Sequence, residues 1–259
     1  MIFSDSKERF SSRVADYVRY RPGYPLGILE ILRAECGLAA EHAIADVGSG
    51  TGLLAEIFLK NGNHVFGVEP NKEMREAGEE YLANYPKFAS VTGSAEATTL
   101  PAACVEFVSA GQAFHWFEPQ ATRAEFARIL KPAGWVAVVW NLRTTPKTPF
   151  SSAYDNLLVR YGTDYTRVKE AHPGASDMKR FFGIRDYRKR ELANRQVFDF
   201  EGLSGRLRSS SYAPREGDAN YEPMMKELRT IFETHQTLGR VNMDYTTQMF
   251  IGQLDGDAA

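Results

Sequence analysis

Short apolar runs alternate with amphipathic segments along the chain as far as Asn141. Short apolar runs bounded by turn residues are typical of buried strands, and apolar residues three and four positions apart are typical of helices. The apolar runs predict five strands, at 43–47, 64–68, 88–92, 105–110 and 135–140. The amphipathic segments predict helices that begin near Leu26, Leu53, Asn71 and Pro119. Strands that alternate with helices in this way indicate βαβ units and a parallel sheet.

The pattern changes after Asn141, where residues 144–149 form a polar, proline-containing connection. Apolar periodicity then predicts helices at 153–161, 163–171, 177–182 and 221–238, and alternation predicts closing strands at 196–200 and 245–251. We therefore expect a single α/β domain over residues 1–259. Its seven-stranded, mostly parallel sheet would carry helices on both faces. Residues 1–143 would form the ligand-binding core, 144–190 a helical insertion over the carboxyl edge of the sheet, and 191–259 the closing strands and helix.

A glycine-rich turn, Asp46-Val47-Gly48-Ser49-Gly50-Thr51-Gly52, joins the first predicted strand to the next helix. Glycines permit a tight turn and a close approach of a ligand to the backbone, and the following helix offers unpaired N–H groups. In open α/β sheets, ligands lie beyond the carboxyl ends of the strands. The third glycine comes one residue earlier than in the dinucleotide-binding fingerprint G-x-G-x-x-G. An ordinary strand-to-helix turn is the alternative for this motif taken alone.

Residues 46–52 match position for position the acid-x-G-x-G-x-G motif of the class I S-adenosylmethionine-dependent methyltransferases, which this chain resembles from residue 1 to about 141. The resemblance implies a Rossmann-like fold, S-adenosylmethionine as cofactor and S-adenosylhomocysteine as product. It also implies a set of cofactor-binding residues. These are Asp46, Gly48, Ser49, Gly50, Gly52, Glu69, Pro70, Met74, Ser94, Ala95, Glu96 and Gln112.

Two further motifs follow the second and third predicted strands. Glu69 lies about twenty residues beyond the first glycine, where a carboxylate can accept hydrogen bonds from both ribose hydroxyls; a solvated charge is the alternative. In the family, the turn Gly93-Ser94-Ala95-Glu96 runs along the adenine edge. Many relatives carry Asp at the position of Ser94, and Glu96 is the candidate to replace it.

The segment 110–117, after the fourth predicted strand, contains three aromatic residues and a histidine. The resemblance implies that Gln112 lies beside the methionine end of the cofactor. A neutral imidazole can act as a general base, which makes His115 a candidate catalytic residue; a structural histidine is the alternative. Trp116 and Phe117 are candidates for contact with the substrate, or they anchor the next helix.

The segment Tyr20-Arg21-Pro22-Gly23-Tyr24-Pro25 resembles the start of the type 11-like small-molecule branch, which includes the trans-aconitate-type methyltransferases. There the segment folds over the cofactor cleft, which implies that Arg21 and Tyr24 contact the methionine carboxylate or an acidic substrate. A guanidinium group suits a carboxylate because it can bond both oxygens. A helix-entry turn set by the two prolines is the alternative.

The acceptor is constrained mainly by motifs that the sequence lacks. No Asn-Pro-Pro-Tyr run follows the fourth predicted strand, which disfavours methylation of amino groups on nucleic-acid bases. Neither Cys36 nor Cys104 follows a proline, which disfavours a cysteine nucleophile for pyrimidine methylation. No cluster of His, Asp and Glu has ligand spacing, so we expect no metal.

Composition adds limits on partners and location. With 43% hydrophobic and 25% charged residues and a net charge of −2, the chain gives no electrostatic case for nucleic-acid binding. The basic run at 185–190 is most simply a solvated face, with contact to an acidic substrate as the alternative. There is no signal-peptide pattern and no apolar stretch long enough to span a membrane. We expect a cytoplasmic monomer or homodimer that acts on a small molecule.

The sequence therefore favours transfer of a methyl group to a small-molecule acceptor, with a carboxylate or hydroxyl oxygen as the candidate atom. A catalytically silent cofactor-binding protein of the same fold is the first alternative, because alignment-driven catalysis requires few obligatory residues. An NAD-dependent oxidoreductase is the second alternative, and the glycine spacing argues against it.

Overall fold

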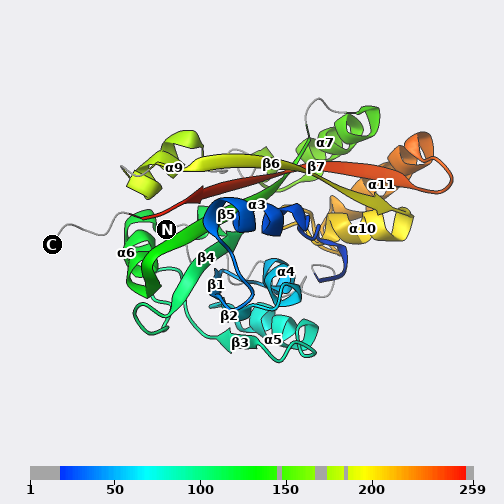
Figure 1. Cartoon of the computed structure of the whole chain (residues 1–259). Helices are drawn as coiled ribbons and strands as arrows, with labels where there is room; N and C mark the ends of the chain where they lie inside the picture. Colours follow the sequence, from blue (N-terminus) through cyan, green and yellow to red (C-terminus); the bar gives the residue numbers. More distant parts are fainter. Residues whose placement is uncertain (1–17, 145–147, 167–173, 184–185, 255–259) are drawn as a thin grey trace.

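The computed structural model describes residues 18–144, 148–166, 174–183 and 186–254, and its centre is a seven-stranded sheet (Figure 1). The strand order is β3-β2-β1-β4-β5-β7-β6, and every neighbouring pair is parallel except those that involve β7. The strands are β1 (Ala43–Val47), β2 (His64–Val68), β3 (Phe88–Val91), β4 (Val105–Gly111), β5 (Leu130–Arg143), β6 (Arg188–Phe198) and β7 (Val241–Gly252). The predicted α/β class and the mostly parallel seven-stranded sheet are confirmed.

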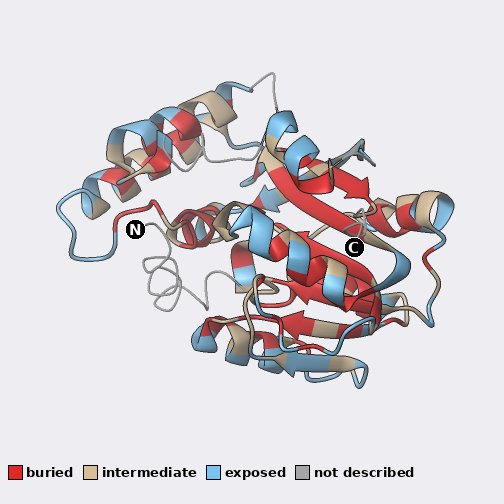
Figure 2. Ribbon diagram, turned by 90° about the vertical axis from the view of Figure 1, so that its left-hand side faces the viewer, coloured by how far each residue is buried: buried red, intermediate tan, exposed pale blue. Residues whose placement is uncertain are grey.

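Helices cover both faces of the sheet, and the central strands β1, β4 and β5 contain many of the most buried residues of the chain (Figure 2). On one face, α3 (Gly27–Cys36) and α4 (Leu53–Lys60) pack Leu32 and Phe58 against Ile44 and Phe107. On the other face, α6 (Pro119–Ile129) and α9 (Ala175–Phe182) form a cluster with Val138. The helix α5 (Lys72–Tyr81) follows β2.

A third apolar cluster lies where β6 and β7 extend beyond the parallel strands. The helices α7 (Pro149–Tyr161), α10 (Phe200–Arg208) and α11 (Tyr221–His235) group together at this end of the molecule (Figure 1). Their buried residues include Leu157, Leu203 and Leu228, which pack with Tyr245 of β7. This cluster gives the closing part of the chain its own small core beside the carboxyl end of β5.

Local capping explains where several helices begin. The Asn71 side chain accepts a hydrogen bond from Met74 N at the start of α5, and Asp199 accepts one from Gly202 N at the start of α10. Glu118 caps α6 in the same way, with Pro119 at the first helical position. These side chains satisfy N–H groups that have no partner within the helix.

The second half departs from the prediction at β6 and α10. The strand predicted at 196–200 begins at Arg188 and ends at Phe198, and the next segment forms α10, which was not predicted. The strand β6 lies at the edge of the sheet, and its residues alternate between half-buried and exposed, most of them polar. Edge strands carry charged side chains on both faces, so apolar alternation does not reveal them.

The predicted helical insertion at 144–190 contains α7 and α9 among its described residues. Met178, Phe181 and Phe182 of α9 pack into the cluster that covers one face of the sheet, and the Phe181 ring lies 4.7 Å from the ring of Phe114, on the loop after β4. Most of the helix predicted at 163–171 lies outside the described residues. None of the described helices is both long and apolar enough to cross a membrane.

Candidate cofactor and acceptor site

The glycine-rich turn leaves β1 and is tied to the end of β2 by its backbone. The N–H groups of Gly48 and Ser49 donate hydrogen bonds to the carbonyl oxygen of Val68, at 2.9 and 3.1 Å. Gly48 and Gly52 have φ angles of +67° and +85°, values that residues other than glycine rarely adopt.

The space around the turn also excludes side chains. A Cβ atom on Gly48 would lie 2.6 Å from the Cβ of Ala113, and one on Gly52 would lie 2.5 Å from a methyl carbon of Leu82. The helix α4 starts directly after Gly52, so its first N–H groups face the turn. The turn therefore has the close-packed backbone and helix terminus expected of a ligand cradle.

Asp46 lies at the base of this turn and is 1% exposed. Its Oδ1 accepts a hydrogen bond of 2.8 Å from the Ser109 hydroxyl on β4, and its Oδ2 is buried with no partner among the described residues. Burial raises the pKa of Asp46 to about 7, against the lowering effect of the Ser109 hydrogen bond. A buried acceptor without a donor favours a ligand that brings a hydrogen-bond donor or a positive charge.

Glu69 follows β2 and links two turns through its carboxylate. Its Oε2 accepts a hydrogen bond from Gly50 N at 2.9 Å, and its Oε1 accepts one from Asn71 N at 2.8 Å. The side chain is 8% exposed and lies directly beside the glycine-rich turn, as predicted for a residue of the same site. A carboxylate offers about four lone-pair positions, so these bonds are compatible with the hydroxyl contacts expected of Glu69.

Pro70 and Met74 follow Glu69 at the start of α5. Pro70 is half-buried. Met74 is buried, and its terminal methyl group would lie 3.2 Å from a Cβ on Gly50. The structure therefore brings Met74, Glu69 and Gly50 together, as a shared site requires.

The turn after β3 is closed by two backbone hydrogen bonds between Ser94 and Ala97, of 3.1 and 3.3 Å. Ala95 is buried within it. The Oε1 of Glu96 accepts a hydrogen bond of 2.9 Å from the N–H of Glu118, before the first turn of α6. Glu96 therefore also helps to hold α6 in place, in addition to the adenine contact expected of it.

The loop after β4 begins with a strained residue. Gln112 has a φ of +56°, which is uncommon outside glycine, and its Nε2 donates to the carbonyl oxygen of Asn141 at 3.2 Å. Such backbone outliers gather at ligand-binding and catalytic sites. The conformation and the hydrogen bond fix Gln112 at the carboxyl ends of β4 and β5, where the methionine end of the cofactor was expected.

The aromatic residues of this loop have separate environments. Phe114 is buried, with its ring 4.7 Å from that of Phe181. Phe117 packs against Phe114 and also borders Gly48, at 3.2 Å from a Cβ placed there. His115 and Trp116 are half-buried, and their ring centroids lie 4.7 Å apart. Phe114 and Phe117 thus anchor the loop in the core, while His115 and Trp116 remain accessible.

The N-terminal segment lies across the ends of β4 and β5. A Cβ on Gly111 would lie 2.5 Å from the Tyr24 hydroxyl, so Tyr24 rests directly on the end of β4. The carbonyl oxygen of Gly23 accepts hydrogen bonds from Asn141 at 3.2 Å and from Asn194 at 2.8 Å. Arg21 donates to the Ser209 carbonyl at 2.8 Å. The segment therefore lies over the ends of β4 and β5, and Arg21 is held against the end of α10.

Three polar residues of the site were not singled out from the sequence. Asn141 Oδ1 accepts hydrogen bonds from the Thr247 hydroxyl at 2.5 Å and from Asn194 Nδ2 at 3.1 Å, which joins β5, β7 and β6. An asparagine directly after the apolar run at 135–140 was the one available signal for this network. Asn194 and Thr247 are brought in by strands that lie far away in the sequence.

The described part of the basic run, Arg188 to Arg190, is paired and lies away from the turn, while Arg185 lies outside the described residues. Arg188 and Arg190 both contact the Glu35 carboxylate of α3, at 3.1 and 2.7 Å. Arg188 and Trp135 help to line a cavity of about 480 Å³ beside the N-terminal end of the apolar run of β5, which is the opposite end of the sheet from the glycine-rich turn. Among the described residues, no group of three or more His, Cys, Asp and Glu side chains is placed to hold a metal ion.

Comparisons with known proteins agree with this geometry. Residues 45–138 match a family model described as a methyltransferase domain. An uncharacterized methyltransferase of Schizosaccharomyces pombe is 27% identical over 230 residues, which cover 87% of each chain. The structure of a putative type II methyltransferase from Anaeromyxobacter dehalogenans aligns with a TM-score of 0.68 at 20% identity, over 92% of this chain and 100% of that one. A Haemonchus contortus phospholethanolamine N-methyltransferase, solved with S-adenosylhomocysteine, aligns with a TM-score of 0.54 at 14% identity, over 98% of this chain and 59% of that one.

Proposed function

We propose that the chain is a class I S-adenosylmethionine-dependent methyltransferase and that it methylates an oxygen atom, carboxylate or hydroxyl, of a small molecule. The observation that carries the proposal is the meeting of the glycine-rich turn with two buried carboxylates, Asp46 and Glu69, at the ends of adjacent strands. The buried Oδ2 of Asp46 suits a cofactor that is rich in donors and positively charged.

We propose that the cofactor is held by four loops, one at the carboxyl end of each of the first four strands. The glycine-rich turn would face the methionine part, Glu69 the ribose and the turn at Ser94 the adenine. Gln112 would lie beside the methionine end of the cofactor, next to the methyl group that is transferred. The full proposed set is Asp46, Gly48, Ser49, Gly50, Gly52, Glu69, Pro70, Met74, Ser94, Ala95, Glu96 and Gln112.

S-adenosylmethionine, when bound, supplies a methyl group on a positively charged sulfur; transfer forms a carbon–oxygen bond to the acceptor, breaks the carbon–sulfur bond and leaves S-adenosylhomocysteine. The residues of the chain then have to align the acceptor and exclude water. Tyr24, which rests on Gly111, and the N-terminal segment over β4 and β5 are suited to closing the site.

His115 distinguishes the two acceptor atoms. A hydroxyl acceptor must lose a proton, and the half-buried imidazole of His115 on the loop after β4 is the proposed base. A carboxylate is already ionised and needs no base. The resemblance of the N-terminal segment to the trans-aconitate-type methyltransferases, together with Arg21, supports an acidic acceptor. Trp116 would line the acceptor side, while Phe117 would act chiefly by supporting the loop.

The test is a transfer assay with S-adenosylmethionine labelled in the methyl group and panels of acids, phenols and amines. We expect labelled product from acids or phenols, and mild alkali separates the two because it hydrolyses methyl esters and leaves ethers intact. His115→Gln should lower the rate with a phenol and flatten its rise with pH, but should leave ester formation unchanged. His64→Gln, at the exposed start of β2, is the matched control. Label found only in amine products would refute the proposed acceptor.

A further inference from the structure

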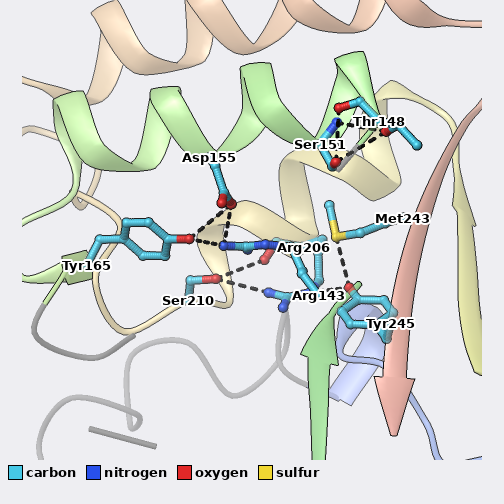
Figure 3. Close-up of polar contacts among 9 residues, drawn as sticks. All are labelled: Arg143, Thr148, Ser151, Asp155, Tyr165, Arg206, Ser210, Met243 and Tyr245. Carbon is cyan, nitrogen blue, oxygen red and sulfur yellow. Dashed lines mark hydrogen bonds and ion pairs between the residues drawn. The ribbon is translucent and has the colours of Figure 1, made fainter. Parts of the chain in front are cut away.

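Two arginines and four tyrosines meet beside the carboxyl end of β5, and we call this group the arginine–tyrosine cluster. Figure 3 shows both arginines and two of the tyrosines, Tyr165 and Tyr245. Its members are Arg143, Tyr154, Tyr165, Arg206, Tyr212 and Tyr245. They come from β5, α7, α10, β7 and the segments that follow α7 and α10. All of these residues are buried except Arg143, whose side chain is 16% exposed. Burial on the scale of Arg206 is unusual for an arginine, and a second, largely covered arginine lies in the same cluster.

Arg143 has a carboxylate partner. Its Nη2 lies 2.7 Å from Oδ1 of Asp155 and also donates to the Tyr165 hydroxyl. The Nε of Arg143 is buried and has no hydrogen-bond partner among the described residues, and the same holds for the hydroxyl of Tyr154. An ion pair therefore accounts for the charge of Arg143 but leaves two polar groups of the cluster unsatisfied.

Arg206 is 5% exposed, and its recorded partners are neutral. Its Nε donates to the Tyr245 hydroxyl at 3.3 Å and its Nη1 donates to the Ser210 hydroxyl at 3.0 Å. Within the described ranges, no carboxylate is recorded as an ion-pair partner of Arg206. A guanidinium group keeps its proton in proteins, so this charge cannot be removed by titration. Among the described residues, the cluster thus holds two permanent positive charges and one carboxylate paired with them, that of Asp155.

Further evidence for an excess of positive charge comes from Tyr212. Burial alone would raise the pKa of its hydroxyl, but the charges of Arg143, Arg206 and Arg21 bring the pKa below the usual value of a tyrosine. Arg21 belongs to the segment over the cleft and is bonded to Ser209, directly after α10. Three guanidinium groups therefore act on one buried region, and such a region favours an anion.

The cluster adjoins the proposed acceptor side of the site. Arg143 follows Asn141 by two residues on β5, so both side chains leave the same face of the strand. The carbonyl oxygen of Asn141 accepts the hydrogen bond from Gln112, and its side chain holds Gly23 of the covering segment. A molecule beside Gln112 would therefore meet Arg143 next along β5.

On the basis of the proposed function, we propose that the methyl acceptor is an organic anion whose carboxylate or phosphate group is bound by Arg143 and Arg206, with Arg21 at the edge. A guanidinium fork bonds two oxygens of either group at once, and its charge acts more strongly in a buried site than in water. The unsatisfied Nε of Arg143 and the Tyr154 hydroxyl add two donors for the same group. Binding of the anionic group would balance the positive charge of Arg143 and Arg206 that Asp155 leaves unbalanced.

The first measurement uses thermal unfolding of the full chain with S-adenosylhomocysteine present. The probes are glutarate, phenyl phosphate, inorganic phosphate and the neutral glutaramide, each compared with sodium chloride at equal ionic strength. An anion that binds only the folded state raises the unfolding midpoint, by an amount that grows with the logarithm of its concentration once this exceeds the dissociation constant. We expect at least one anionic probe to raise the midpoint and glutaramide to have no effect. A larger rise of the midpoint with glutarate than with the two phosphates would indicate a carboxylate site, and the reverse would indicate a phosphate site. No specific rise with any anion would overturn the proposal.

The second measurement compares variants with the anion that binds. Arg206→Met keeps most of the side-chain volume and removes the charge, and Arg195→Met, an exposed arginine of β6 paired with Asp244, is the matched control. We expect the dissociation constant of the anion to rise at least fivefold in Arg206→Met and to stay unchanged in Arg195→Met. A rise below fivefold would overturn the proposal. If Arg206→Met does not fold, Arg206→Lys takes its place. It keeps the charge but lacks the guanidinium group, and the dissociation constant of the anion should again rise at least fivefold.

Binding of S-adenosylhomocysteine, measured by calorimetry on the same preparations, separates this inference from the proposed function. Arg206→Met should bind it as the wild type does, because Arg206 has no recorded contact with the glycine-rich turn. If the wild type binds it and methylates neutral phenols while no anion binds, the inference fails and the proposed function stands. If the wild type does not bind it, the proposed function fails first.

Discussion

Asp46, the buried acid below the glycine-rich turn, should make the free energy of unfolding of the cofactor-free protein depend on pH. Asp46 has a pKa of about 7 in the folded chain because it is buried, against an ordinary value of 3.8. The folded state therefore binds this proton more tightly than the unfolded state. It follows that this residue makes the free energy of unfolding fall as the pH rises from about 4 to about 7, and contributes no further change above that range.

The size of the effect follows from the same two pKa values. Each unit of difference corresponds to about 1.4 kcal/mol, which gives a total of about 4 kcal/mol across the full range. Between pH 5 and pH 8 the linkage relation gives a loss of about 2.5 kcal/mol. Replacement of Asp46 by Asn removes the titrating group, and the side-chain oxygen can still accept the Ser109 hydrogen bond. The variant should lose this pH dependence, whatever its absolute stability.

Urea unfolding at pH 5, 6, 7 and 8 measures this difference directly. We expect the wild type to lose about 2.5 kcal/mol more than Asp46→Asn between pH 5 and pH 8. Asp218→Asn, an exposed acid, is the control and should follow the wild type. Parallel pH profiles for the wild type and Asp46→Asn would refute the assignment of a raised pKa to this residue.

Three other substitutions test the site and its surroundings. Gly50→Val places a branched side chain at a φ of +56° beside Met74, and calorimetry should detect no S-adenosylhomocysteine binding while the circular dichroism spectrum is retained. Glu69→Ala should weaken that binding by roughly 1–3 kcal/mol; an affinity equal to wild type would show that Glu69 only holds the turns. Asp155→Asn leaves Arg143 without its carboxylate and should lower the free energy of unfolding by about 3–5 kcal/mol in urea, and a change near zero would contradict the ion pair.

The first half of the fold and the close packing of the glycine-rich turn could be predicted because their determinants are local. Positive φ angles at Gly48 and Gly52 and the crowding around them admit no side chain, so the turn is visible as a spacing of glycines. The apolar run at 135–140 is buried on both faces as the core of β5. The position of Glu69 beside the glycine-rich turn follows from its place directly after β2, the strand next to β1.

The second half could not be predicted with the same accuracy because its determinants are contacts between distant segments. The strand β6 is held in the sheet by its backbone pairing with β7, while its side chains are largely polar. The helix α10 contains Gly202 and Gly205, which weaken the local preference for a helix. Gly205 is needed there because the Tyr20 ring lies 2.1 Å from the position of its Cβ.

The arginine–tyrosine cluster shows the same limit at the level of single residues. Arg143 and Arg206 are 63 positions apart in the chain, and neither lies in a recognisable motif. Their shared environment arises only when α10 packs beside the end of β5. The turns of the proposed cofactor site are therefore visible in the sequence, while the proposed acceptor-binding groups come together only through the packing of the closing helices.

Calorimetric titration of the wild-type chain with S-adenosylhomocysteine, in the presence and absence of excess NADH, tests the central claim most directly. The glycine spacing and the carboxylates Asp46 and Glu69 predict one binding site per chain, unaffected by NADH. A folded chain that shows no binding, or one from which NADH displaces the ligand, would contradict the assignment of this turn to S-adenosylmethionine.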